Sequence, residues 1–309
     1  NPGDIVLCEE FCYQGALNRF RKLGAKIEAM KLDADGIVID ALAQQLADLK
    51  AKGIQPKFIY TIPTIQNPTA SILPLDRRHG LIALAREYNV AIFEDECYAD
   101  LLWDGIEAPP ALYALAPDCT IHLGSFSKCL APALRLGYLI AEWDIMKRLL
   151  PLKGDSGTGA LDQMVVAEYF SKNFGKHLNH LNGVFKEKLD CMVEAVAREF
   201  GASAECWAPK GGIFLWIKLP EHIDVRKLLK PAADAGIIFN EGPAWAVSPD
   251  NSSSHLRLCF AMPSKQVIQD GVKAFVADKL HHWNWIPYLM GNGGNVFKAP
   301  PENLTPTFA

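Results

Sequence analysis

Strand-like and helix-like segments alternate through the first half of this 309-residue chain. Short apolar or β-branched runs read as strands: 4–9, 26–32, 57–62, 90–95, 120–125 and 135–141. Segments with helical apolar spacing lie between several of them: 14–23, 39–52 and 74–88. Strands separated by helices of this length indicate βαβ units. The pattern therefore predicts an α/β fold with a buried, mostly parallel sheet flanked by helices.

The second half has a different pattern. Two helices are expected at 161–174 and 176–200, and two more at 225–236 and 265–279. The expected strands lie between them: 211–219, 237–240 and 255–260. This order predicts a smaller C-terminal α+β domain reached through a long connecting helix. We therefore divide the chain into a large domain (1–155), connecting helices with a small domain (156–280), and a loosely ordered tail (281–309).

Composition excludes several classes of protein. The net charge of −4 gives no electrostatic case for nucleic-acid binding. No run of about 18 apolar residues predicts a membrane span. The eight cysteines form no CxxC pair, which favours reduced thiols in a cytoplasmic protein over a disulfide or zinc framework. The chain begins with Asn1 and enters a strand almost at once, so we expect upstream sequence to be missing.

Lys128 is the most informative single residue, within SFSKCLAPALRLGY (125–138). Its neighbours are largely apolar, and burial disfavours the charged form of an amine. A neutral amine can form a Schiff base with an aldehyde. Ser125, Ser127 and Arg135 are the residue types that hold a phosphate. An amine beside a phosphate site indicates pyridoxal 5′-phosphate (PLP), whereas the alternative is an ordinary surface loop.

Three further candidates follow predicted strands, on the sheet edge where open α/β folds bind ligands. Asp95, in FEDECYADL, could pair with a protonated pyridine nitrogen, or could be one of the acids common at strand ends. Its neighbours Glu94 and Glu96 are expected to be structural or exposed. Tyr98 and Asn67 could donate to the cofactor's phenolic oxygen, although an Asn before Pro is also common in turns.

Two candidates lie farther apart in the chain. Arg257 alternates with apolar neighbours on the expected strand 255–260 and offers a fork of donors for a substrate carboxylate. A structural salt bridge is the alternative. Tyr13, at a helix start, could stack on an aromatic cofactor, whereas aromatic residues in such positions often belong to the core.

Taken together and in this order, six segments resemble the class I/II aminotransferases of PLP fold type I. They are NPGDIVLCEEFCYQGAL, YTIPTIQNPTAS, FEDECYADL, SFSKCLAPALRLGY, PKGGIFLWIKLP and HLRLCFAM. The resemblance covers residues 1 to about 280. It is closest to the 2-aminoadipate, kynurenine and aromatic aminotransferases and to the related domain of MocR regulators.

The resemblance implies a ping-pong transaminase acting on an α-amino acid and a 2-oxo acid, in amino acid metabolism, as a homodimer. Lys128 would form the internal aldimine and transfer the substrate proton. Arg257, with Asn67, would bind the substrate α-carboxylate, and the peptide bond before Pro68 would be cis. The implied cofactor contacts are Tyr13, Asn67, Asp95, Tyr98, Ser125, Ser127, Lys128 and Arg135.

The chain departs from the family pattern in three places. Ala70 and Ala133 stand where the family has glycine, and alanine adopts a positive φ less readily. The family's phosphate loop at a helix N-terminus, and the segment that helps close the site and form the dimer, would lie upstream of Asn1. From this departure we expect weak PLP binding, or a need for upstream sequence in folding.

Three other functions stay open at this point. The same fold supports other PLP reactions, such as β-elimination or decarboxylation. A MocR-type domain would bind PLP and sense a ligand without turnover. A plain α/β module would have lost PLP altogether. The subgroup implies an aromatic or long acidic substrate, and the sequence itself does not reveal the preferred side chain.

Overall fold

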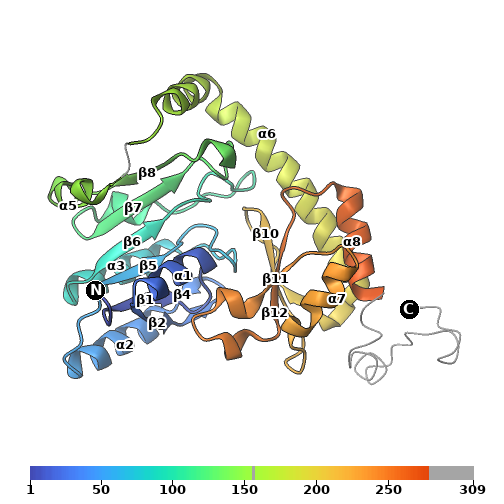
Figure 1. Cartoon of the computed structure of the whole chain (residues 1–309), viewed down its shortest axis with the longest axis horizontal. Coiled ribbons are helices and arrows are strands. Elements are labelled where there is room, and N and C mark those ends of the chain that lie inside the picture. Colours follow the sequence, from blue (N-terminus) through green and yellow to red (C-terminus); the bar gives the residue numbers. More distant parts are fainter. Residues whose placement is uncertain (155–156, 278–309) are drawn as a thin grey trace, which may run out of the picture.

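The computed structural model describes residues 1–154 and 157–277, and its largest element is a six-stranded sheet (Figure 1). Its strands, in spatial order, are β2 (Lys26–Met30), β1 (Ile5–Glu9), β5 (Phe58–Thr61), β6 (Ala91–Asp95), β7 (Thr120–Ser125) and β8 (Gly137–Ile140). Every neighbouring pair is parallel except β7 and β8. The predicted mostly parallel sheet is confirmed.

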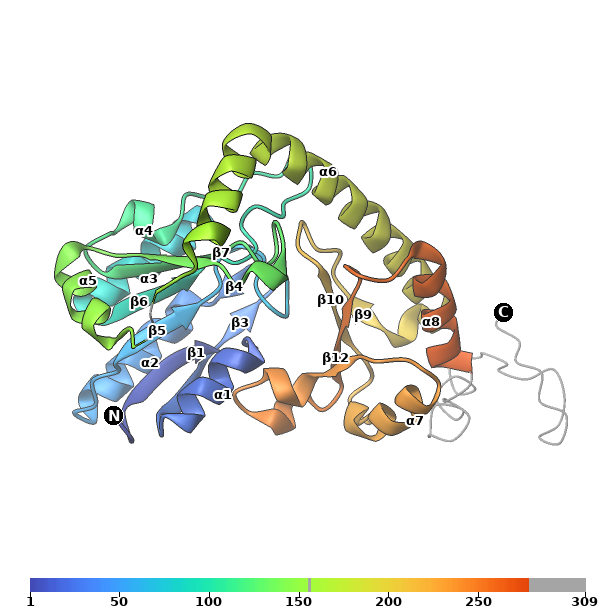
Figure 2. The same cartoon turned by 45° about the horizontal axis from the view of Figure 1, so that its top comes forward.

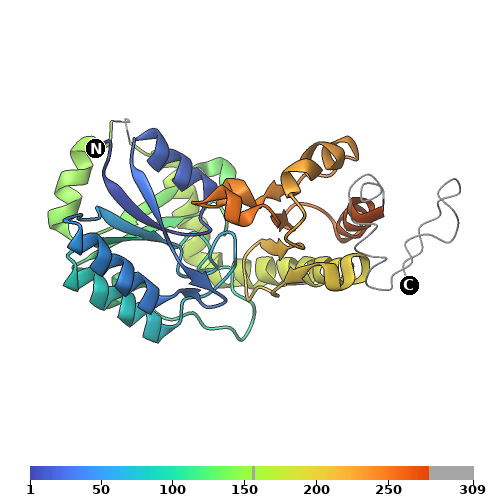
Figure 3. The same cartoon turned by 90° about the horizontal axis from the view of Figure 1, so that it is seen from below.

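Helices cover both faces of this sheet (Figure 3). Helices α2 (Ile39–Ala51) and α3 (Leu75–Glu87) pack on one face, against buried Leu7, Ile59 and Ile92. Helix α1 (Gln14–Lys22) packs on the other face, with Val6, Cys8 and Tyr60 in the same core cluster. Successive strand side chains point to opposite faces. Strands apolar on both faces are therefore buried between two helical layers.

Short elements connect these layers. They are the hairpin of β3 (Leu32–Asp33) and β4 (Gly36–Ile37), and the helices α4 (Leu112–Leu115) and α5 (Trp143–Leu149). Strand β8 follows a single turn of 3₁₀ helix at Pro132–Leu134.

A continuous helix, α6 (Ala160–Phe200), links the large sheet to the rest of the chain (Figure 2). The prediction of two helices, at 161–174 and 176–200, is wrong. A glycine in a helix interior costs about 1 kcal/mol relative to alanine, which weakens a helix without ending it. An added Cβ at Gly175 would meet no atom within 4 Å, so nothing packs there to interrupt the helix.

The second sheet is small and antiparallel. Its order is β11 (Asn240–Glu241), β12 (His255–Cys259), β10 (Phe214–Lys218) and β9 (Glu205–Cys206). Helix α7 (Leu229–Asp234) lies beside it, and α8 (Lys265–Ala277) packs on α6. The smaller α+β unit is thus present. The predicted domain limits stay a prediction, since the 155 boundary and the 281–309 tail lie outside the described residues.

The predicted strand 237–240 is shorter and later than expected. The backbone N–H of Ile237 donates to the carbonyl of Ala232 and so completes the end of α7. Ile238 is 89% exposed, and the ladder begins only at Asn240. The β-branched residues Ile237 and Ile238 therefore follow the end of α7 and do not form a strand, because tertiary contacts override local β-propensity.

Several contacts hold the small sheet close to the large one. Trp103 donates from its indole nitrogen to the Pro209 carbonyl at 2.6 Å. Gly211 pairs with Leu102, and an added Cβ at Gly211 would lie 2.1 Å from the Leu101 carbonyl oxygen. Only glycine permits this approach. It brings the start of β10 next to the loop that follows β6.

Two further observations concern the described residues. No helix among them has both the length and the apolar character to cross a membrane. All eight cysteines lie within the described part of the chain as free thiols.

Candidate active site

The carboxyl ends of β5, β6 and β7 meet along one edge of the large sheet. β5 ends at Thr61 and leads to Asn67, β6 ends at Asp95, and β7 ends at Ser125. The three are neighbours because β6 pairs with β5 on one side and with β7 on the other. This places the candidates at the position where parallel sheets bind ligands.

Asn67 joins two predicted site residues. Its side-chain amide donates to the Tyr98 hydroxyl at 3.2 Å, and its side-chain oxygen accepts from Arg257 at 2.7 Å. All three side chains are buried. Both ends of the amide are thus assigned, with the oxygen toward the guanidinium. Asn67 and Arg257 are 190 residues apart in the chain, so tertiary folding alone brings them together.

Arg257 is a buried cation with no carboxylate partner among the described residues. Its second guanidinium nitrogen donates to Asn240 at 2.7 Å, and its Nε is buried without a partner. The rings of Phe214 and Trp245 lie 3.7 and 3.6 Å from the guanidinium carbon. Burial lowers the pKa of the Arg257 guanidinium to about 10. The anticipated alternative, a structural salt bridge, is not found in this region.

Asp95 accepts one hydrogen bond on each carboxylate oxygen. Tyr60, on β5, donates to Oδ2 at 2.6 Å, and the Cys97 thiol donates to Oδ1 at 2.8 Å. Asp95 is half-buried. Neither donor was predicted from the sequence. The parallel pairing of β5 with β6 is the only signal that could have indicated Tyr60.

Lys128 lies in the turn after β7 and is half-buried. Burial raises the pKa of the Cys97 thiol, and the positive charge of Lys128 partly opposes that rise. The backbone N–H of Ser127 donates to the Ser125 hydroxyl at 3.1 Å, so the two serines are joined within the turn that carries the lysine.

Arg135 is placed less simply. It is exposed, has a positive φ of 52°, and donates to the Pro132 carbonyl at 3.1 Å. No hydrogen bond joins its guanidinium to Ser125 or Ser127 among the contacts of this turn.

Tyr13 lies at the N-terminus of α1, where β1 leads into the helix. It is 43% exposed, and its ring centroid lies 6.0 Å from that of Trp245. Since Trp245 also packs on Arg257, Tyr13 belongs to the same region of the molecule. Its exposure argues against the simple core alternative.

The loop that carries Asn67 has an unusual backbone. The Asn67–Pro68 peptide is cis, as the resemblance implied, and Ala70 has a positive φ of 60°. Ala70 therefore adopts the left-handed conformation at the cost that glycine would avoid. Ala133, the other departure, lies in the 3₁₀ turn and needs no positive φ.

A buried carboxyl beneath this loop helps to shape it. Glu9 accepts hydrogen bonds from Thr61 at 2.6 Å and from the Gln66 amide at 2.8 Å. The Gln66 side-chain oxygen in turn accepts from the backbone and hydroxyl of Thr69, both at 2.8 Å. Burial raises the pKa of Glu9 to about 7, against the opposing effect of these hydrogen bonds.

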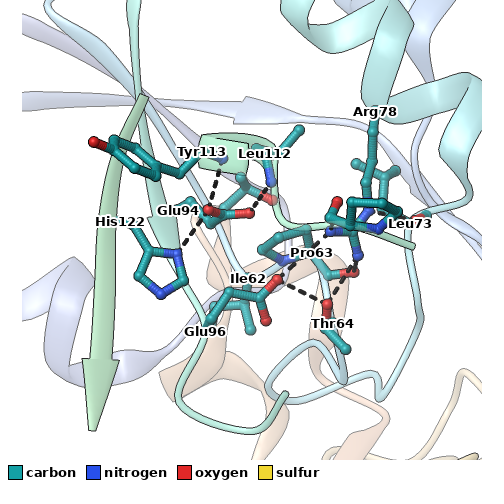
Figure 4. A network of polar contacts seen from close by, with 12 residues as sticks. Ile62, Pro63, Thr64, Leu73, Arg78, Glu94, Glu96, Leu112, Tyr113 and His122 are labelled. Carbon is teal, nitrogen blue, oxygen red and sulfur yellow. Dashed lines mark hydrogen bonds and ion pairs between the residues drawn. The ribbon is translucent and has the colours of Figure 1, made fainter. Parts of the chain in front are cut away.

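The acids on either side of Asp95 are buried and structural (Figure 4). Glu94 accepts from the backbone N–H groups of Leu112 and Tyr113 and contacts His122 at 2.9 Å. Glu96 accepts from Thr64 at 2.8 Å and lies 3.6 Å from Arg78. A structural role, one of the two alternatives expected for Glu94 and Glu96, is therefore confirmed. The other alternative, an exposed position, is wrong.

Arg78 is fully buried and satisfies several backbone groups around the Asn67 loop (Figure 4). Its guanidinium donates to the carbonyls of Leu73, Pro110 and Pro63 and to the hydroxyl of Thr64.

Replacing Arg78 by Met is expected to lower the free energy of unfolding by about 3–5 kcal/mol, because buried acceptors lose their donor. Arg86→Met is the matched control, since Arg86, on the same helix, makes an exposed ion pair with Asp118 and should cost at most about 1 kcal/mol. Urea denaturation of both variants checks this. An equal loss of unfolding free energy in the two variants would contradict this role of Arg78.

Comparison with known proteins agrees with this geometry. The family model described as aminotransferase class I and II matches residues 1–275. The chain belongs to the class I and II aminotransferase family. It is 32% identical, over 88% of its length and 66% of the relative's, to aromatic-amino-acid aminotransferase 1 of Thermococcus litoralis. The chain thus spans about two thirds of the length of this relative.

The chain is also similar to a solved structure and to a further relative. The structure of the α-aminoadipate aminotransferase LysN of Thermus thermophilus, complexed with N-(5′-phosphopyridoxyl)-L-leucine, superposes with a TM-score of 0.82 at 31% identity. The match covers 89% of this chain and 70% of that one. An uncharacterized HTH-type transcriptional regulator of Bacillus subtilis is 28% identical over 87% of this chain and 55% of the regulator. The predicted family and fold type are confirmed.

Besides Tyr60 and Cys97, Asn240 was not predicted from the sequence, and Phe214 and Trp245 had no predicted role at the site. Both aromatic side chains are buried. Their contact with a cation had no sequence signal, because it depends on the pairing of β12 with β10 and β11.

Proposed function

We propose that this aminotransferase-family chain catalyses PLP-dependent transfer of an amino group between an α-amino acid and a 2-oxo acid. The observation that carries the proposal is the buried Arg257 guanidinium, which has no carboxylate partner in the described ranges and is linked through Asn67 to Tyr98. A buried cation needs a counter-ion. A substrate carboxylate bound beside the cofactor-contacting residues would provide one.

The donor set suits PLP. Tyr98 accepts from Asn67 and keeps its own proton, since burial raises its pKa above the usual range, so it can donate to a phenolic oxygen. Asp95 offers a carboxylate to the pyridine nitrogen, and Ser125 and Ser127 offer hydroxyls to the phosphate. When bound, PLP supplies the aldehyde and the electron-withdrawing ring that make the substrate Cα proton acidic.

The chain's own residues then have separate tasks. Arg257 and Asn67 hold the α-carboxylate and so orient the Cα–H bond. Lys128 provides the amine that would accept the Cα proton and deliver it to the carbon atom supplied by the cofactor's aldehyde group. Asp95 stabilises the positive charge on the ring nitrogen, and Tyr13 covers the ring. The contribution of Arg135 to phosphate binding is part of the proposal, and would require its side chain to turn from Pro132.

Aromatic and 2-aminoadipate-like amino acids are the proposed substrate classes, supported by the names of the relatives. The proposed compartment is the cytoplasm, consistent with the free thiols.

A homodimer is the proposed assembly. It is supported by exposed apolar side chains on three successive elements, β8, α5 and the start of α6: Tyr138, Ile140, Trp143, Leu161 and Met164. The largest apolar patches on a protein surface are often binding sites.

A ligand-sensing domain is the second candidate, favoured by the similarity to the HTH-type regulator. Such a domain would hold PLP through the same residues and would not turn over substrate. The two candidates differ only in their response to amino acids.

The test is an absorbance spectrum after adding PLP to the wild type and to Lys128→Ala, followed by a panel of amino acids. The wild type is expected to show a violet-region band that Lys128→Ala lacks and that amino acids convert. The variant should lose about 10²- to 10⁴-fold in turnover, the usual contribution of a general base.

Other outcomes separate the candidates. A Lys128-dependent band that no amino acid changes would favour the sensor. Release of ammonia together with the side-chain leaving group would favour β-elimination, and release of carbon dioxide would favour a decarboxylase. No band in the wild type would overturn PLP binding.

A further inference from the structure

Two side chains, Tyr60 and Cys97, donate hydrogen bonds to Asp95. The proposed chemistry gives neither of them a role. Tyr60 reaches Oδ2 from the neighbouring strand β5, and Cys97 reaches Oδ1 from the turn after β6. The terminal torsion of an aspartate side chain is broad, so a carboxylate without donors can rotate. One donor on each oxygen removes that freedom.

Both donors keep their protons. Burial and the charge of Asp95 raise the pKa of the Tyr60 hydroxyl and of the Cys97 thiol, each well above the ordinary value. Neither group therefore loses its proton near neutral pH. Each donates a hydrogen bond to the Asp95 carboxylate over the working pH range. Hydrogen bonds to a charged acceptor are stronger than neutral ones.

The two donors are themselves held in place. Tyr60 is 4% exposed and meets the ring of Phe20 edge-on, with centroids 5.6 Å apart. Cys97 is half-buried and only two residues from Asp95 in the turn after β6. The thiol therefore lies against the carboxylate that the proposed reaction needs.

We propose that Tyr60 and Cys97 are positioning residues, which hold the Asp95 carboxylate in the one rotation from which it pairs with a protonated ring nitrogen. This inference rests on the proposed function. It assigns a role to two side chains that the proposed function does not use for binding substrate or cofactor. Because Cys97 is a weak donor and Tyr60 a strong one, Tyr60 makes the larger contribution.

The experiment measures PLP affinity and the circular dichroism of the bound cofactor, which reports how the ring is held. Tyr60→Phe and Cys97→Ala are compared with Cys97→Ser, which restores a donor, and with Cys119→Ala, a half-buried thiol whose contact with the Ala116 carbonyl is 3.9 Å. Thermal unfolding of each cofactor-free variant checks that it folds.

We expect Tyr60→Phe to weaken PLP binding about tenfold and Cys97→Ala several-fold, the range for a lost hydrogen bond to a charged group. Both should reduce the ellipticity of the cofactor band. Cys97→Ser should recover most of the loss, and Cys119→Ala should match the wild type.

A double-mutant cycle with Asp95→Asn isolates the mechanism. If Tyr60 acts through Asp95, Tyr60→Phe should have little further effect in the Asp95→Asn background. Equal effects in both backgrounds would overturn the inference, and so would unchanged affinity and ellipticity in variants of a wild type that binds PLP. If the wild type binds no PLP at all, the proposed function fails and this inference fails with it.

Discussion

Asp95→Asn is expected to lower kcat/KM for transamination by about 10²- to 10³-fold, the scale for losing one preorganised electrostatic contact. The amide has nearly the same shape but carries no charge, so it cannot stabilise a protonated ring nitrogen. Without that proton the ring is a weaker electron sink. Steady-state kinetics with one amino acid and one 2-oxo acid provide the measurement.

The neighbouring acid supplies the control. Burial raises the pKa of Glu96 to about 8, and the charge of Arg78, 3.6 Å away, opposes that rise. Glu96 accepts from Thr64 and has no assigned contact with the cofactor, so Glu96→Gln, which keeps an acceptor oxygen there, should leave kcat/KM within about threefold of wild type. A loss with Glu96→Gln as large as that with Asp95→Asn would show that charge at Asp95 is not the cause.

Arg257→Lys is expected to lower kcat/KM for α-amino acids by about 10²-fold, mainly through KM. Lysine keeps the positive charge but loses the planar fork that reaches Asn67 and Asn240 at 2.7 Å each. It also leaves the faces of Phe214 and Trp245 without the flat group stacked between them. The variant therefore tests geometry separately from charge.

The decisive comparison uses an amine that has the same side chain but no α-carboxylate. Its single-turnover rate should be the same in wild type and Arg257→Lys, since the fork has nothing to bind. Arg226→Lys is the matched control, because Arg226 pairs with Asp224 at the surface. An equal loss for the amine lacking the carboxylate would contradict the assignment of Arg257.

Strand-edge residues are predictable because their position follows from local sequence. Each parallel strand is visible as a short apolar run, and all parallel strands end at the same sheet edge. Asp95, Ser125 and the loop of Asn67 can therefore be placed together from the order of the strands alone. The structure puts them at the ends of β6, β7 and β5.

Two predictions are wrong because a local signal is ambiguous. Gly175 suggests a helix boundary, yet α6 continues through it because one glycine costs little in a helix of 41 residues. The apolar pair Ile237–Ile238 suggests a strand, yet the end of α7 uses the backbone N–H of Ile237. Both outcomes depend on neighbours that local sequence does not specify.

The sequence by itself determined the parallel α/β architecture, the family and the edge of the sheet that carries the candidate residues, because periodicity and short motifs are local properties of the chain. Only the tertiary structure decided which groups touch. It joined Arg257 to Asn67 across 190 residues, and Tyr60 to Asp95 across 35. Such contacts depend on strand pairing and on the placement of one sheet against the other, which no local pattern encodes.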